Sequence, residues 1–157
     1  MRGNAGCRTK HHFIYYEHVS LPEFISEMKA QNIVWSAAVT TVAEAKATAA
    51  AGADVIVAQG AEAGGHRGVF DAGEAEVKTI GLFALLPAVV DAVDVTVEAT
   101  DGIADASGVA AVLTLGASSV QIGTGLLRTL EARLVQAWAD AIGAAAPKHT
   151  MVTRAFS

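Results

Sequence analysis

The chain has 157 residues, enough for one domain with a sizeable core, and 52% of them are hydrophobic, which excludes a disordered chain. The net charge of −5 and the lack of a basic stripe with interleaved aromatic residues argue against a nucleic-acid partner. With one cysteine, no apolar run near the roughly 20 residues of a membrane span and no signal-peptide pattern, the chain is expected in the cytoplasm without a membrane partner.

The first expected elements are a strand, a helix and a second strand. Phe13–Glu17 is predicted as a strand. Ser20-Leu-Pro-Glu23 has the spacing of a capping box, in which a hydroxyl and a carboxylate satisfy free N–H groups, and so opens a helix through about Ala30. Asn32–Val39 has the short apolar run of a buried strand.

The next segments continue the alternation. Thr41-Val-Ala-Glu44 is a second capping box, and its Ala-rich helix is expected to stop near Gly52, because glycine tolerates positive φ. Asp54–Gln59 is predicted as a strand. One apolar stripe at helical spacing follows, formed by Leu82, Leu85, Leu86, Val89, Val90 and Val93. Pro87 lies inside this stripe, so the regular helix is expected to begin there.

The last third of the chain repeats the pattern. Val95–Ala99 is a predicted strand, and Asp105 is placed to cap a helix that stops at Gly116. Ser118–Ile122 is the last predicted strand. A closing helix is predicted from the spacing of Leu127, Leu130, Leu134, Trp138 and Ile142.

About five β/α units in strict alternation predict an α/β fold with a parallel sheet and helical crossovers. Two architectures satisfy this pattern. One is a small open doubly wound sheet, and the other is part of an eight-unit barrel. The pattern of elements does not separate the two.

The loop Gln59–Gly68 carries the first candidate site, because it follows a predicted strand at its C-terminal end. Gly64 and Gly65 permit a close approach of backbone N–H groups to a ligand, and His66 follows them directly. An imidazole exchanges protons near neutral pH, which makes His66 the candidate catalytic residue. A flexible turn with an incidental histidine is the simpler interpretation of this loop taken alone.

Two further glycine-containing segments follow predicted strands. They are Asp101-Gly-Ile-Ala-Asp105 and Gln121-Ile-Gly-Thr124. Free backbone amides at such positions bind anions, and in barrels the loops after the last two strands often hold a phosphate. Two ordinary turns remain the alternative interpretation.

Taken together, these motifs resemble the nitronate monooxygenase family, formerly called 2-nitropropane dioxygenases. The matching text is AQGAEAGGHRG at 58–68, LLPAVVDAV at 85–93, DGIAD at 101–105 and LGASSVQIGTGLL at 115–127. The resemblance covers residues 20–157, whereas residues 1–19 match poorly. It implies the C-terminal portion of an FMN-binding (β/α)8 TIM barrel, about its last five β/α units.

The resemblance also implies the chemistry. Members of this family oxidise alkyl nitronates or nitroalkanes with O2 to a carbonyl compound and nitrite, with FMN as cofactor and no metal. His66 would orient the nitronate or take a proton from a nitroalkane. Gln59 and Gly64 would contact the flavin. The residues implied at the phosphate end are Gly102, Gln121, Ile122, Gly123 and Thr124.

Three residues depart from the family pattern. Asp101 stands where the first of two glycines is usual and brings a carboxylate to the implied phosphate site. Glu98 lies in a predicted barrel strand where an aliphatic residue is usual, and its burial without a partner would be costly. Gly125 replaces a common arginine.

Three alternatives to the monooxygenase interpretation of the whole chain follow from the same residues. The related FMN-dependent enoyl-acyl-carrier-protein reductase shares the glycine motifs and a similarly placed histidine. A catalytically inactive barrel fragment and a phosphate-ligand module are the other two. Open barrel edges also predict self-association of the chain.

Overall fold

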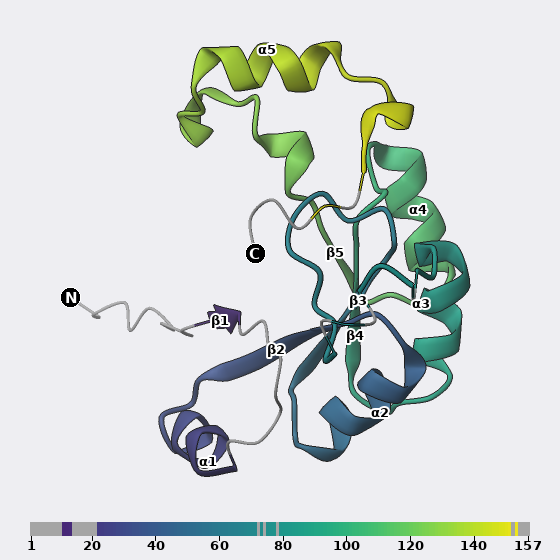
Figure 1. Ribbon diagram of the computed structural model, residues 1–157. Helices are drawn as coiled ribbons and strands as arrows, with labels where there is room; N and C mark the ends of the chain where they lie inside the picture. Colours follow the sequence, from purple (N-terminus) through teal and green to yellow (C-terminus); the bar gives the residue numbers. More distant parts are fainter. Residues whose placement is uncertain are drawn as a thin grey trace, which may run out of the picture.

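The computed structural model describes residues 11–13, 22–71, 73, 75–77, 79–151 and 153, and its centre is a parallel sheet (Figure 1). The sheet contains β1 His11–Phe13, β2 Val34–Val39, β3 Val55–Gln59, β4 Thr96–Thr100 and β5 Ser119–Gln121. Neighbouring strands pair in parallel and follow one another in chain order. The strand order of an open doubly wound sheet reverses at a switch point, whereas the strands of a (β/α) barrel stay in sequence. The order therefore favours the barrel.

A helix connects each pair of neighbouring strands. These helices are α1 Pro22–Ala30, α2 Val42–Ala50, α3 Leu82–Val90 and α4 Ala106–Thr114. After β5 the chain forms the short 3-10 helices Thr124–Leu126 and Leu130–Ala132, helix α5 Gln136–Ala144 and a last 3-10 helix, Pro147–His149. Helix α5 lies apart from the sheet (Figure 1).

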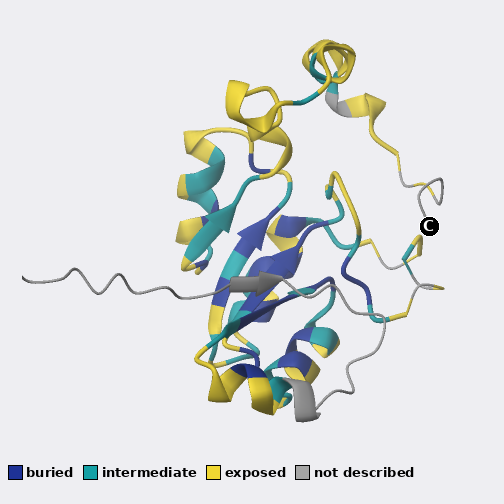
Figure 2. Ribbon diagram, turned by 90° about the vertical axis from the view of Figure 1, so that its left-hand side faces the viewer, coloured by how far each residue is buried: buried dark blue, intermediate teal, exposed yellow. Residues whose placement is uncertain are grey.

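The two faces of the sheet differ in chemistry because successive side chains of a strand alternate between them. One face is apolar and packs against the buried sides of the helices. Figure 2 shows that much of the sheet is buried. Its strand residues are Trp35, Ala37, Val39, Ile56, Ala58, Val97, Ala99 and Val120. The strand register places a mostly polar set on the opposite, inner face. This set contains Ser36, Gln59, Glu98, Thr100, Ser119 and Gln121.

Glu98 on this inner face is half-buried and has a partner. Its Oε1 accepts a hydrogen bond of 2.7 Å from Ser119 Oγ on the neighbouring strand. Because the carboxylate is hydrogen-bonded, the cost of an unpaired buried charge does not arise at this position.

The capping predictions for α2 and α4 are confirmed. Thr41 Oγ1 accepts a bond of 3.1 Å from Glu44 N, and Glu44 Oε2 accepts one of 3.0 Å from Thr41 N. Glu44 Oε1 also accepts from Phe70 N at 3.1 Å, so one carboxylate joins the start of α2 to the loop after β3. Asp105 Oδ1 accepts from Gly108 N at 3.0 Å at the start of α4.

The prediction that the third helix begins at Pro87 is wrong, because α3 begins at Leu82 and contains this proline. A carboxylate from the preceding loop, Glu62, accepts a bond of 3.1 Å from Leu82 N at the start of the helix. Leu82, Leu85, Leu86 and Val89 of the predicted stripe are all buried. Burial of four large side chains outweighs the one backbone hydrogen bond that a proline cannot donate.

The predicted closing helix is also corrected. Only Trp138 and Ile142 of its five apolar positions lie in α5, and Arg133 adopts a left-handed φ of 51° between the 3-10 turns and that helix. Leu130 is 94% exposed. The helical spacing is present, but among the described residues no buried surface accepts this stripe, so nothing stabilises one continuous helix.

Two predictions near the N-terminus fall partly or wholly on residues outside the described part of the chain. Ser20 of the first proposed capping box lies there, and so do residues 14–17 of the first predicted strand. The strand that is described, β1, ends at Phe13, where the prediction began.

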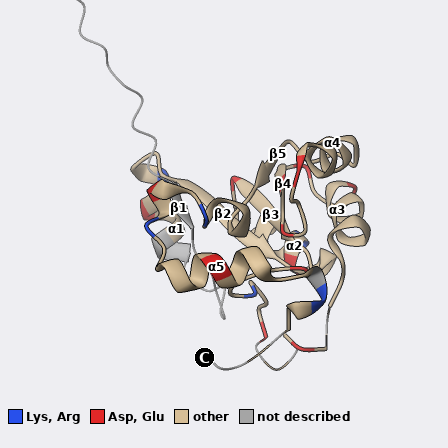
Figure 3. Cartoon of the chain, turned by 90° about the horizontal axis from the view of Figure 1, so that it is seen from above, with Lys and Arg blue, Asp and Glu red and all other residues tan. Residues whose placement is uncertain are grey.

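No described helix combines the length and the apolar character needed to cross a membrane. Nor does the described part of the chain contain a cluster of three His, Cys, Asp or Glu side chains placed to hold a metal ion. Seen from above, charged residues of both signs are scattered over the described ribbon (Figure 3).

Candidate active site

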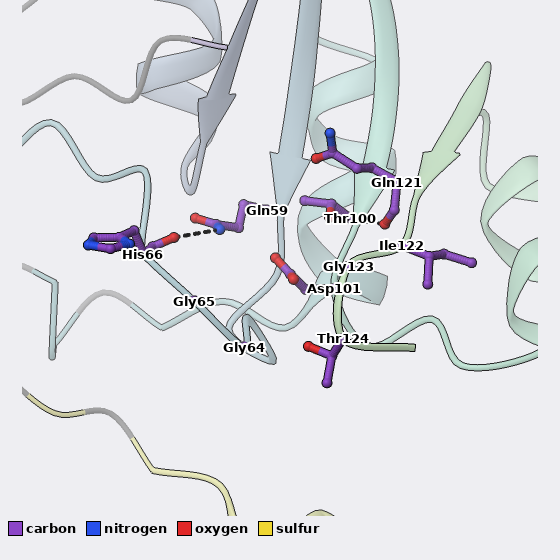
Figure 4. Close-up of a pocket in the computed structure, with 10 residues that line it drawn as sticks. All are labelled: Gln59, Gly64, Gly65, His66, Thr100, Asp101, Gln121, Ile122, Gly123 and Thr124. Carbon is purple, nitrogen blue, oxygen red and sulfur yellow. Dashed lines mark hydrogen bonds between the residues drawn. The ribbon is translucent and has the colours of Figure 1, made fainter. Parts of the chain in front are cut away.

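A pocket of about 470 Å³ lies at the C-terminal ends of β3, β4 and β5 (Figure 4). Its volume is within the range of roughly 300–1,000 Å³ that is usual for small-molecule sites. The residues that line it are Gln59, Gly64, Gly65, His66, Thr100, Asp101, Gln121, Ile122, Gly123 and Thr124. This is the end of the strands at which barrel enzymes carry their active sites.

The floor of the pocket is one layer of polar side chains. Strand pairing places Gln59 beside Thr100 and Thr100 beside Gln121 on the inner face. The Thr100 hydroxyl donates a bond of 3.1 Å to the carbonyl oxygen of Gln121. Thr100 was not among the sequence-based candidates. The alternation within β4, which points Glu98 and Thr100 to the same face, is the signal that finds it.

Gln59 holds the loop that carries the candidate histidine. Its side chain is 5% exposed. Its Nε2 donates to the carbonyl oxygen of His66 at 3.0 Å, and its Oε1 accepts from Gly68 N at 2.7 Å. Both ends of the amide therefore fix the His66–Gly68 backbone over the end of β3.

Glycines let this loop pass close to its neighbours. A Cβ atom on Gly68 would lie 2.7 Å from the Ala38 Cβ on β2, and one on Gly64 would lie 2.9 Å from Thr124 Oγ1. At Gly65 and Gly123 such an atom would meet nothing within 4 Å. The loop after β3 thus touches the segment after β5 at one side of the pocket, and open space remains beside the two other glycines.

His66 lies at the margin of the pocket. The side chain is exposed, and its imidazole points away from the other labelled side chains (Figure 4). Only its carbonyl oxygen is engaged by Gln59. The imidazole is therefore open to solvent at the margin of the pocket.

Asp101 brings a carboxyl group into the pocket from the end of β4. Its φ is +75°, and its Oδ2 atom is buried without a hydrogen-bond partner. Burial raises the pKa of this carboxyl above its ordinary value of 3.8, and the nearby Glu62 charge adds to the rise. Hydrogen bonds from the Gln59 side chain and the Gly64 backbone oppose the rise, as does the charge of Arg67.

Gly102 is the one sequence-based candidate that is not among the residues lining the pocket. Its φ is +69°, and a Cβ atom there would lie 3.3 Å from the Glu62 Cβ. Glu62 in turn bonds to the start of α3. Gly102 therefore lies against the loop that caps α3, while the other seven candidates are brought together around the pocket.

Comparisons with known proteins show the family to which the chain is similar. Residues 7–157 match the family model described as nitronate monooxygenase. A probable nitronate monooxygenase of Staphylococcus aureus (strain Newman) is 42% identical over 135 residues, which are 86% of this chain and 38% of that protein. A protein of the same description from strain JH9 is 42% identical over 133 residues. The chain thus spans less than half the length of these relatives.

Solved structures show the same fold. Nitroalkane oxidase from Streptomyces ansochromogenes has a TM-score of 0.73 and 39% identity, over 80% of this chain and 36% of that one. FabK from Thermotoga maritima has a TM-score of 0.74 and 29% identity, over 87% of this chain and 40% of that one. Together with the strand order, these likenesses confirm part of a TIM barrel.

Proposed function

The chain belongs to the nitronate monooxygenase family, and from this premise we propose that it binds FMN and takes part in the oxidation of alkyl nitronates by O2 to a carbonyl compound and nitrite. The observation that carries the proposal is the pocket at the strand ends, where glycine backbones and amide side chains surround about 470 Å³. The cytoplasm is the proposed location.

Two features of the pocket support a flavin as its ligand. Gln59, Thr100 and Gln121 present polar groups along its floor, and Gly65 and Gly123 leave open space at its wall. We assign Gln59 and Gly64 to the flavin, and Gly102 with the run 121–124 to the phosphate end. The bound flavin supplies the electron transfer, while the protein supplies binding, orientation and electrostatics.

His66 is the proposed catalytic residue. An unprotonated ring nitrogen of its imidazole takes the proton from the carbon next to the nitro group of a nitroalkane, which leaves a nitronate anion beside an imidazolium cation. When the nitronate is supplied directly, the protonated ring attracts and orients it. Gln59 acts as a positioning residue because it holds the His66 backbone.

Substrate turnover with bound FMN tests this function. The purified chain is incubated with FMN and desalted, bound flavin is measured by its visible absorption, and nitrite release is followed with propionate 3-nitronate and with a neutral nitroalkane. His66→Ala is expected to keep bound flavin but to lower turnover of the nitroalkane by about 10²–10⁴-fold, the usual contribution of a general base. Turnover of the preformed nitronate should fall less.

His149→Ala is the matched control, since this second histidine is exposed on the last 3-10 helix and does not line the pocket. Equal turnover in His66→Ala and the unchanged chain would remove His66 from the mechanism. A chain that stays colourless after desalting would contradict the proposed function and favour an inactive or phosphate-binding module.

A second candidate function is favoured by the likeness to FabK from Thermotoga maritima. It is the FMN-dependent reduction of enoyl-acyl-carrier-protein thioesters. NADH oxidation that depends on an enoyl thioester, without nitrite release from nitronates, would favour this candidate over the monooxygenase.

A further inference from the structure

Asp101 brings a carboxyl group into the wall of the pocket, whereas the side chains of the floor, Gln59, Thr100 and Gln121, are uncharged. It directly follows β4 and adopts a φ of +75°, a region in which glycine has no strain and Asp and Asn are the most tolerated other residues. Oδ2 is buried and has no hydrogen-bond partner. An ionised carboxylate without a partner is costly in a buried position. This position therefore favours either protonation of Asp101 or movement of its side chain.

The donors that face Asp101 belong to the pocket itself. The backbone N–H of Gly64 and the side-chain amide of Gln59 both lower the pKa of its carboxyl, against the rise caused by burial. Gly64 lies beside Thr124, since a Cβ atom on this glycine would come within 2.9 Å of Thr124 Oγ1. Figure 4 shows the Asp101 carboxyl turned toward Gln59 within the group of lining residues. Asp101 thus places a carboxyl group at the junction of the loops after β3 and β5, where backbone N–H groups would otherwise favour an anionic ligand group.

We propose that Asp101 acts as an internal anion in this pocket, so that an ionised Asp101 weakens the binding of the phosphate end of FMN and lowers the affinity for FMN relative to that for riboflavin. The inference rests on the proposed flavin pocket and names the charge class of its ligand. A phosphate monoester carries a charge of about −1.5 to −2 near pH 7. An ionised Asp101 repels this charge.

The discrimination depends on pH. A protonated Asp101 carries no charge and turns from an acceptor into a donor toward a phosphate oxygen. The ionisable side chains around it are Glu62 and Arg67 on the loop after β3, and His66 lines the same pocket. The pocket residues of β5 and its following segment, Gln121–Thr124, are uncharged. The affinity for FMN relative to riboflavin is therefore expected to rise as Asp101 gains its proton.

Titration of the purified chain with FMN and with riboflavin tests the inference, with the dissociation constants measured by flavin fluorescence at acidic and at slightly alkaline pH. Asp101→Asn removes the charge and keeps a residue that tolerates positive φ, whereas Asp101→Gly removes the whole side chain. Both are expected to raise the FMN affinity, relative to riboflavin, on the order of tenfold at alkaline pH. Asp91→Asn, at an exposed position after α3, removes a carboxylate outside the pocket and should leave the ratio unchanged.

The pH dependence gives a second readout. The phosphate of FMN has its own ionisation near pH ~6, but it is common to all variants. The contribution of Asp101 is therefore the difference in the FMN-to-riboflavin affinity ratio between the unchanged chain and Asp101→Asn. This difference should become smaller in acid, where Asp101 is protonated. If flavin binds and the FMN-to-riboflavin ratio is the same in all variants, the inference is wrong while the proposed function stands. If no variant binds either flavin, both are wrong.

Discussion

The backbone at Asp101 explains which residues this position accepts. Among the described non-glycine residues, only Asn32, Asp101 and Arg133 have positive φ. A left-handed conformation brings the Cβ close to the following carbonyl oxygen, which costs roughly 1–2 kcal/mol for most residues and much less for Asp or Asn. The position therefore accepts a carboxyl group without a change of fold. The consequence of Asp101 is electrostatic rather than conformational.

The stability of the chain should carry the pH signature of Asp101. Its pKa is raised in the folded protein, chiefly by burial. A carboxyl group whose pKa is raised by folding stabilises the folded protein only while it is protonated. This stabilisation is fully present below pH 3.8, the ordinary pKa of the group, and is lost as the pH rises through the pKa that the group has in the folded protein. Asp101→Asn should therefore become more stable relative to the unchanged chain as the pH rises from acid toward neutral. Urea unfolding across this range measures the difference.

The matched variant for this measurement is Asp91→Asn, which removes an exposed carboxylate outside the pocket and so reports the effect of losing a surface carboxylate. A difference for Asp101→Asn that is constant with pH, or that grows toward acid, would show that burial does not disfavour the ionised form of Asp101.

At the scale of elements, the loop after β3 is the part that organises the pocket. Gln59 holds its backbone at His66 and Gly68, and Glu44 holds Phe70. Further along the chain, Glu62 Oε2 accepts from Leu82 N at the start of α3. These bonds use side chains from a strand end and a helix start to hold the described parts of the segment between β3 and α3. The loop is therefore anchored at His66, Gly68 and Phe70 and, through Glu62, at the start of α3.

A pair of glycine substitutions within this loop tests how closely the loop is held against β2. Gly68→Ala places a Cβ atom 2.7 Å from the Ala38 Cβ and 3.2 Å from the Ala38 oxygen, so either the loop or β2 must shift. We expect a loss of about 1–3 kcal/mol in the free energy of unfolding, typical of overpacking. Gly65→Ala meets nothing within 4 Å and should change stability by less than about 1 kcal/mol. Thermal and urea unfolding of both variants give the comparison.

The double variant Gly68→Ala with Ala38→Gly separates the direct contact from other effects. Removal of the opposing Cβ should recover part of the loss, which appears as a favourable coupling in a double-mutant cycle. Equal destabilisation by the two single glycine variants would mean that the close approach of the loop to β2 is not a constraint.

The sequence predicted best the features that depend on local chemistry. The Thr41–Glu44 capping box, the Asp105 cap and the apolar runs of β2 to β5 are encoded within a few residues and were confirmed. Their alternation left two architectures open, and the strand order decided between them because pairing depends on contacts that are distant in sequence.

The errors arose where tertiary contacts decide the outcome. Pro87 is tolerated inside α3 because the helix buries an apolar stripe against the sheet. The preference of proline for the first turn of a helix takes no account of this burial. The apolar spacing after residue 126 predicted one helix, yet no described surface buries those side chains. Within the site, the strand register added Thr100 to the pocket and left Gly102 outside its lining.

At the scale of the whole molecule, the described sheet does not close on itself. β1 and β5 occupy its two edges, so each has one side without a strand partner among the described residues. The segment after β5 adds exposed apolar side chains, of which Leu130 is 94% and Trp138 is 64% exposed. Figure 2 shows this segment as largely exposed in contrast to the buried sheet. Open strand edges and exposed apolar surface both favour association with other chains.

We therefore propose that this chain associates with itself in solution, and we expect its mass to rise with concentration in size-exclusion chromatography with light scattering. Trp138→Ser together with Leu130→Ser should shift the mass toward that of the monomer, because both changes remove exposed apolar surface without touching the buried core. Ala137→Ser, on the same helix and also exposed, adds a hydroxyl where no large apolar group is lost and should leave the mass unchanged. A monomer at every concentration would contradict the prediction. Persistent association in the double variant would instead locate the contact at the strand edges, where backbone N–H and C=O groups rather than side chains form the bonds.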